Sequence, residues 1–244
     1  MIIVSKNNAL VKELAALKEK KGRRLKGTYL VEGEKMVREC VASGQKIKRL
    51  IAREDYAGER YPYETLTLGH DAFAAVCDAK TPQPIAAEVV LPDRAIMPPV
   101  GPCILLDGVA DPANVGAVIR TAVAAGYSSL YCIDCADPYS PKSVRSSMSG
   151  IFFANIMQGS REEVFFALGD VPVIAADMGG KNVFSFTPPE QFALAIGNEG
   201  NGLSAAVRER AAYTVSIPMG EHTESLNAAV SAGILMYLLK NKTV

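Results

Sequence analysis

The chain of 244 residues contains no tryptophan and only two histidines, His70 and His222. Two histidines exclude a metal site built from several imidazoles, and no aromatic residues interleave with a basic stripe to stack single-stranded bases. No apolar run reaches the roughly 18 residues of a membrane span, and nothing resembles a signal peptide. We therefore expect a cytoplasmic protein with no membrane segment and no metal.

Several motifs of common enzyme classes are also absent. There is no P-loop lysine, no G-x-G-x-x-G dinucleotide fingerprint and no G-x-S-x-G nucleophile elbow. An α/β oxidoreductase is disfavoured for this reason. The five cysteines are odd in number, and in the absence of an export signal we expect reduced thiols. Cys132 and Cys135 have CxxC spacing within an expected strand, where core packing is the favoured interpretation.

Formal charge is zero overall but is distributed unevenly. Residues 1–53 hold 14 Lys and Arg against 5 Asp and Glu, whereas residues 54–244 hold 12 against 21. The segment "KEKKGRRLKG", residues 18–27, contains six cations. A solvated surface is the simpler explanation of a charge run, but this density at one end favours a nucleic-acid partner.

The first third of the chain predicts a small α/β domain of mixed order, residues 1–91. Helices are expected at 7–20, 34–43 and 71–79, a basic turn at 18–27, and strands at 28–33, 47–53, 64–68 and 84–91. The stretch 92–101, with three prolines and a glycine, predicts a linker.

Residues 102–244 alternate regularly between apolar strands and helices. Strands are expected at 103–107, 129–134, 152–157, 171–177, 192–197 and 213–218, and helices at 114–125, 142–149, 161–168, 203–210 and 224–240. This order predicts a parallel sheet covered on both faces, so ligands should collect at the carboxyl ends of its strands.

Three loops at those ends are unusual. In "DGVADPANVGAVIRTA", Asp111-Pro112 predicts a turn and Asn114 a helix cap. Arg120 lies in an apolar helix, so we expect its guanidinium to find a partner, either an internal carboxylate or a ligand. We favour the ligand, because the helix starts at the ligand edge of the sheet.

The second loop, "GNEGNGLS", carries three glycines that let the backbone approach a ligand, with Glu199 beside them, although a flexible turn explains the glycines equally. The third, "SIPMGEHTESLN" at 216–227, precedes a long apolar helix. Ser225, Thr223 or Glu224 can cap that helix, but capping needs only one or two of its many polar groups.

In this order, "DGVADPANVGAVIRTA", "LAIGNEGNGLS" and "IPMGEHTESLNAAVSAGILMYLL" resemble the three signature motifs of the SpoU (TrmH-like) RNA 2′-O-ribose methyltransferases of the SPOUT superfamily. "YLVEGEKMVRECVASG" and "DAKTPQPIAAEV" resemble the L30e-like substrate-binding domain of that family, and "YSPKSVRSSMSGIFFANI" resembles the segment between the first two motifs.

The resemblance implies an S-adenosylmethionine-dependent enzyme that methylates a ribose 2′-hydroxyl of structured RNA. It further implies a parallel-sheet α/β domain, residues 102–244, with a trefoil knot that forms the cofactor pocket, and a homodimer. Ribosomal RNA of the 23S type is favoured over transfer RNA, and a resistance methylase remains an alternative. A non-catalytic RNA-binding member of the fold is disfavoured because the whole expected catalytic set is present.

The resemblance also assigns residues. The expected catalytic set is Asn114, Arg120, Glu199, Ser225 and Asn227. The expected cofactor set is Ala176, Asp177, Ile196, Gly197, Asn198, Gly200, Ile217, Met219 and Leu226. For RNA we expect Lys20, Lys21, Arg23, Arg24 and Lys26 from the basic segment, and Arg145 from the resemblance.

Three positions depart from the family pattern, namely Pro84, Ile151 and Asn198. None lies in the expected catalytic set. A guanidinium is protonated at neutral pH and therefore a poor base, so Arg120 is better suited to stabilising alkoxide charge and gripping a phosphate than to removing a proton. The residues leave open which RNA, which nucleotide and which proton acceptor are involved.

Overall fold

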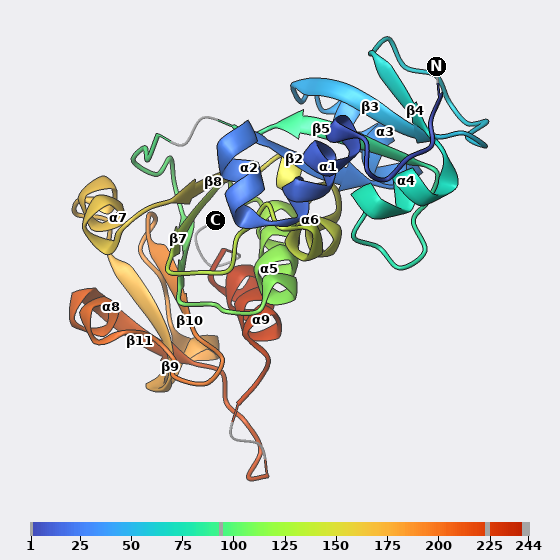
Figure 1. Ribbon diagram of the computed structural model, residues 1–244. Coiled ribbons are helices and arrows are strands. Elements are labelled where there is room, and N and C mark those ends of the chain that lie inside the picture. Colours follow the sequence, from blue (N-terminus) through green and yellow to red (C-terminus); the bar gives the residue numbers. More distant parts are fainter. Residues whose placement is uncertain (1, 93–94, 223–224, 241–244) are drawn as a thin grey trace. The chain divides into compact units, whose positions relative to one another are not determined.

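The computed structural model describes residues 2–92, 95–222 and 225–240, which form two compact units (Figure 1). The first unit comprises residues 1–93 and 139–152, and the second comprises 94–138 and 153–244. The sequence assigns 139–152 to the carboxyl-terminal domain, whereas their contacts group them with the first unit. Within the described ranges, no helix is both long and apolar enough to cross a membrane.

The first unit is built around a five-stranded mixed sheet in the order β1-β4-β3-β5-β2, as the mixed pattern predicts. Its strands are β1 (Ile2–Ile3), β2 (Thr28–Glu32), β3 (Ile47–Arg53), β4 (Thr65–Leu68) and β5 (Ile85–Val90). Its helices are α1 (Ala9–Ala15), η1 (Ala16–Lys18), α2 (Lys20–Lys26), α3 (Glu34–Ala42), α4 (His70–Val76), α6 (Pro141–Ser147) and η2 (Met148–Phe152).

The basic segment is a helix, not the expected turn. Gly22 in α2 marks a close approach, because a Cβ there would lie 2.0 Å from the Ala16 carbonyl oxygen. Arg23 is 3% exposed, and its guanidinium donates to the carbonyls of Leu17 (2.8 Å) and Lys18 (2.7 Å). Arg23 therefore ties α2 to the preceding helical turn, and its assignment to RNA binding was wrong.

Segment 139–152 packs into the first unit through three kinds of contact. The rings of Tyr139 and Tyr29 lie 5.1 Å apart, and Gln45 donates to the Phe152 carbonyl at 3.0 Å. Arg145 forms an ion pair with Asp78 at 2.7 Å. An expected RNA-binding cation is thus already paired with a carboxylate of its own chain.

The second unit contains a fully parallel six-stranded sheet in the order β11-β9-β10-β6-β7-β8. Its strands are β6 (Cys103–Asp107), β7 (Ser129–Ile133), β8 (Asn155–Gln158), β9 (Val173–Asn182), β10 (Ala193–Gly197) and β11 (Ala211–Ser216). Its helices are α5 (Pro112–Ala124), α7 (Arg161–Leu168), η3 (Val183–Ser185), α8 (Ala205–Arg210) and α9 (Ala228–Lys240).

Helices cover both faces of this sheet. Residues of α7 and α8, such as Val164 and Val207, share a buried cluster with Leu105 and Tyr131. Helices α5 and α9 lie against the opposite face (Figure 1). The strand expected at 152–157 begins only at Asn155, because Phe152 closes a 3₁₀ turn, and β9 extends five residues beyond the expected end at Asp177.

Helix α7 begins with a capping box that supports a stability prediction. The Ser160 hydroxyl accepts from the Glu163 amide at 3.2 Å, and the Glu163 carboxylate accepts from the Ser160 amide at 2.8 Å. We expect Ser160→Ala to lower the free energy of unfolding by about 1 kcal/mol, measured by denaturant titration. The exposed Ser128, changed to alanine, is the control and should leave the midpoint unchanged; equal losses in both variants would contradict the role of the cap.

Candidate active site

The carboxyl ends of neighbouring parallel strands bring the unusual loops together. Gly197 at the end of β10 pairs in register with Asp107 at the end of β6, so the loops that follow these strands begin side by side. The loop after β11 leads into α9, which lies against α5. The expectation that the polar loops share one edge of the sheet is therefore met for the residues described.

Three side chains from the three loops form one hydrogen-bonded chain. The Asn114 side-chain amide donates to Glu199 Oε1 at 2.8 Å, and Asn227 Nδ2 donates to Asn114 Oδ1 at 2.9 Å. The backbone amide of Ala110 donates to the other Glu199 oxygen at 3.3 Å. Asn114 is 9% exposed and lies between its two partners, so it sets their relative positions.

The local structure leaves both asparagines available for this chain. Asp111, not Asn114, caps α5, because its carboxylate accepts from the Ala113 amide at 2.9 Å and Pro112 occupies the first turn. Asn227 caps α9 through its Oδ1, which accepts from Ala229 (2.9 Å) and Val230 (3.2 Å), while its Nδ2 reaches Asn114. Of the three expected caps, Ser225 is exposed and Asn227 caps the helix in its place, while Thr223 and Glu224 lie outside the described residues.

Hydrogen bonding sets the charge state of Glu199. Partial burial favours its neutral form, but the bond from Asn114 and the backbone amides of Glu199, Ala110 and Asp111 outweigh burial, so the pKa of Glu199 is lowered. The carboxylate is therefore ionised at neutral pH. The chain of bonds should weaken only as the pH falls through this lowered pKa.

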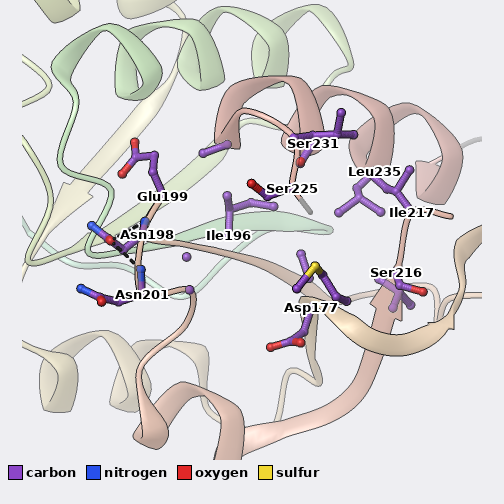
Figure 2. Close-up of a pocket in the computed structure, with 18 of the residues that line it drawn as sticks. Asp177, Ile196, Asn198, Glu199, Asn201, Ser216, Ile217, Ser225, Ser231 and Leu235 are labelled. Atoms are coloured by element: carbon purple, nitrogen blue, oxygen red, sulfur yellow. Dashed lines mark hydrogen bonds between the residues drawn. The ribbon is translucent and has the colours of Figure 1, made fainter. Parts of the chain in front are cut away.

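A cavity of about 420 Å³ lies beside these hydrogen-bonded side chains, with Glu199 at one end and Ser216 at the other (Figure 2). This volume falls in the range typical of small-molecule sites. Every residue of the expected cofactor set lines the cavity, as do Glu199 and Ser225 of the expected catalytic set. The lining adds Met178, Asn201, Gly202, Arg208, Val215, Ser216, Ala228, Ser231 and Leu235.

Arg120 is not brought into this arrangement within the described chain. Its side chain is exposed on α5, with no hydrogen bond or ion pair to the described residues, and does not line the cavity. The expectation that the apolar helix buries this guanidinium was wrong. Of the expected RNA-binding residues, Lys20, Lys21 and Arg24 are exposed on α2, and Lys26 pairs with Glu13 at 3.0 Å.

Family models match nearly the whole chain. The SpoU rRNA Methylase family model matches residues 101–237, more than half of the chain, and an MRM3-like substrate binding domain model matches residues 8–87. The chain belongs to the SpoU methylase family. The expected family, the parallel-sheet α/β fold and the separate amino-terminal substrate-binding domain are thereby confirmed.

Relatives of this SpoU-family chain include curated enzymes that match along its whole length. It is 34% identical, over 98% of each chain, to a 23S rRNA (guanosine(2553)-2′-O)-methyltransferase of Bacillus subtilis. It is 31% identical to a 23S rRNA (uridine(2479)-2′-O)-methyltransferase of Streptomyces viridochromogenes, over 96% of this chain and 90% of that one.

Two solved structures contain the cofactor. The SpoU methyltransferase AviRb from Streptomyces viridochromogenes in complex with AdoMet matches with a TM-score of 0.87 and 28% identity, over 96% of this chain and 98% of that one. An AdoMet-bound rRNA methyltransferase from Sinorhizobium meliloti matches with a TM-score of 0.85 and 27% identity, over 98% and 96%.

One charged residue of this SpoU-family cavity was missed from the sequence. Arg208 on α8 lines the cavity and forms an ion pair with Asp177 at 2.6 Å, and its Nε donates to the Leu203 carbonyl. A basic residue in the helix after "GNEGNGLS" is the only sequence signal for it. The sequence did not show that β9 and α8 meet at the cavity.

Cys135 follows β7 rather than lying within the expected strand, and the pKa of its thiol is shifted in the opposite direction to the pKa values of Cys40 and Cys103. A hydrogen bond from Cys132 lowers the pKa of Cys135 most; burial opposes this, and backbone amides of Val109 and Gly108 add to the lowering. Burial raises the pKa of Cys40 and of Cys103 to about 12. We expect iodoacetamide at pH 8 to alkylate Cys135 of the folded protein at least about tenfold faster than either.

Peptide mapping by mass spectrometry over time measures this order. Cys135→Ser should remove the fast phase and leave the slow one unchanged. A fast phase that maps to Cys40 or Cys103 would contradict the assignment.

Proposed function

We propose that this protein transfers the methyl group of S-adenosylmethionine to a ribose 2′-hydroxyl of ribosomal RNA, of the 23S type. The observation that carries the proposal is the bond chain from Glu199 through Asn114 to Asn227 beside a cavity lined by all the expected cofactor residues. The activities printed for the full-length relatives support the same reaction.

The cavity fits the proposed cofactor by its size and its lining. Ile217, Leu226 and Leu235 offer an apolar wall for an aromatic base, and Asp177 with Arg208 offers both charges. Gly197 lets the backbone approach closely, because a Cβ there has no room. S-Adenosylmethionine, when bound, supplies a methyl group already activated on a sulfonium.

The residues of the chain then have to align and hold the ribose. Asn227 donates to Asn114, so each fixes the other, and Ser225 lines the cavity, so these groups are suited to orient a sugar hydroxyl. Glu199 is ionised and already accepts several hydrogen bonds, which suits it to orienting Asn114. Alignment is the main contribution expected of the protein.

Arg120 is proposed to stabilise the developing alkoxide and to grip the adjacent phosphate, because its guanidinium is free within the described chain. Arg120→Lys keeps the charge and loses the planar fork. Single-turnover methylation should fall in this variant. Full methylation by Arg120→Lys would disprove the role.

A homodimer, a trefoil knot and a cytoplasmic location belong to the same proposal. On α9, Val230 and Tyr237 are 51% and 48% exposed, an apolar surface suited to a second copy of the chain. Sedimentation equilibrium tests the dimer.

Lys20, Lys21 and Arg24 are proposed to add salt-dependent affinity for RNA phosphates.

Methylation with radiolabelled S-adenosylmethionine tests the function. The protein should label 23S ribosomal RNA and not transfer RNA, and nucleotide mapping in RNA from cells with and without the gene should find a 2′-O-methyl group. Label in transfer RNA alone would identify the alternative substrate. Calorimetry that detects no binding of S-adenosylmethionine would favour a non-catalytic RNA-binding protein.

A further inference from the structure

Glu199 lies on a short loop that is hydrogen-bonded to the rest of the unit through two residues, Asn198 and Asp107. The loop runs from Asn198 to Ser204, and its ends are closed by a pair of backbone hydrogen bonds between Asn198 and Gly202, each 2.9 Å. The Glu199 carboxylate accepts from its own backbone amide, and its other hydrogen bonds come from Ala110, Asp111 and Asn114, which lie outside this loop. Its position therefore depends on how this loop is fastened to the loop after β6.

Asn198 makes the first fastening. Its Oδ1 accepts from the amides of Gly200 (2.9 Å) and Asn201 (3.0 Å), and its Nδ2 donates to the Gly108 carbonyl at 2.8 Å. An amide side chain has two acceptor sites and two donor hydrogens, so three of the four are used inside the protein. Little hydrogen-bonding capacity remains for a ligand, although the residue lines the cavity.

Asp107 makes the second fastening at the far end of the same loop. It is 3% exposed at the end of β6, and its Oδ2 accepts from the Ser204 amide at 2.7 Å. Its other oxygen lies 3.5 Å from Arg161. A buried carboxylate with these partners holds the start of α8 against the strand that leads to the Asn114 loop.

We propose that Asn198 and Asp107 are positioning residues that fasten loop 198–204 to loop 108–111 and thereby hold the Glu199 carboxylate opposite Asn114. The inference rests on the proposed function of the site and assigns Asn198 a role other than cofactor binding. The two hydrogen bonds run in opposite directions between the segments. Asn198, in loop 198–204, donates to Gly108 in the other loop, whereas Asp107, at the end of β6, accepts from Ser204 in loop 198–204.

If this proposal holds, a substitution that disrupts loop 198–204 should also loosen loop 108–111. Asn198→Asp keeps the acceptor for Gly200 and Asn201 but replaces the donor to Gly108 with a negative charge that faces a carbonyl. Loop 108–111 should then loosen, because Ala110 reaches Glu199 only while the two loops are in register. Asp107→Asn is the second variant, and it weakens the far fastening without changing the size of the side chain.

Hydrogen–deuterium exchange of the full chain without RNA is the first measurement. In Asn198→Asp, peptides that cover 108–111 and 198–204 should both exchange faster, whereas a local role would change only the second. Gln191→Ala is the matched control, since it also removes an amide donor to a distant carbonyl, that of Pro99 at 3.2 Å. This measurement needs no activity, so it remains decisive if ribosomal RNA proves not to be the substrate.

Steady-state methylation is the second measurement. We expect kcat to fall about 10- to 100-fold in Asn198→Asp while KM for S-adenosylmethionine changes less than about threefold. The acid limb of the pH profile should move to higher pH in both variants, because a misplaced Glu199 loses the bonds that lower its pKa. Unchanged exchange in 108–111, or a raised KM with unchanged kcat, would overturn the proposal.

Discussion

Asn114→Asp should lose methyl transfer by about 10²- to 10⁴-fold at pH 8, the range associated with positioned catalytic groups. The variant keeps the acceptor for Asn227 but replaces the donor to Glu199 with a carboxylate, at a separation that is 2.8 Å in the native pair. Two carboxylates this close cannot both be ionised, so the pKa of one must rise.

The direction of the pH response separates this explanation from simple misfolding. In the native protein the pKa of Glu199 is lowered, so acidification through that value weakens the site. In Asn114→Asp a proton shared by the two carboxyls restores a donor, so activity should recover in part as the pH falls from 8 towards 6. Between pH 8 and 6 Glu199 stays ionised in the native protein, so its titration should not change native activity, whereas the activity of Asn114→Asp should rise as the pH falls.

Asn155→Asp provides a matched control. Asn155 is exposed on β8, and its replacement makes the same amide-to-carboxylate change away from the cavity. It should retain native activity and the native pH profile. Thermal melts of both variants show whether they fold. An Asn114→Asp protein as active as the native one at pH 8 would remove Asn114 from the proposed machinery.

The sequence predicted the architecture of the site because its strongest signals were local. Apolar strands alternating with helices indicated a parallel sheet, and loops at one edge of such a sheet must be neighbours. The residues that meet, Asn114, Glu199 and Asn227, were singled out by the resemblance of those loops to the family's signature motifs. Their mutual hydrogen bonds depend on side-chain directions, which the sequence does not contain.

Arg120 shows where flanking residues mislead. Val118, Ile119 and Ala122 are buried, and they were taken to surround the guanidinium. A helix turns about 100° per residue, however, so these three cluster on one side while Arg120 lies roughly opposite to them. The same sequence therefore gives an apolar inner face and one exposed cation.

The basic segment was expected to be a turn, and it is a helix for a related reason. Gly22 does not break the helix, because its lack of a Cβ serves the packing of α2 on the preceding helical turn. Gly27, with φ of 63°, is the residue that ends α2. Local composition cannot separate a glycine that breaks a helix from one that lets a neighbour approach, since the neighbour is set by tertiary structure.

Gly197→Ala should abolish binding of S-adenosylmethionine in the accessible range and lower methyl transfer by about 100-fold or more, since sub-ångström placement is lost. A Cβ at Gly197 would lie 2.3 Å from the Gly202 carbonyl carbon and 2.4 Å from the Leu203 nitrogen. Both are backbone atoms, and the Asn198–Gly202 hydrogen bonds hold them in place. The loop must open, and the wall of the cavity opens with it.

Gly179→Ala separates this steric effect from the loss of glycine as such. Gly179 lies in the same unit, no atom lies within 4 Å of its ideal Cβ, and neither glycine has a positive φ. The control should bind the cofactor with native affinity and unfold at or slightly above the native temperature. Isothermal titration of both variants decides the matter: native affinity in Gly197→Ala would mean that the cofactor does not depend on the closed loop, and the cavity beside Glu199 would then not be its site.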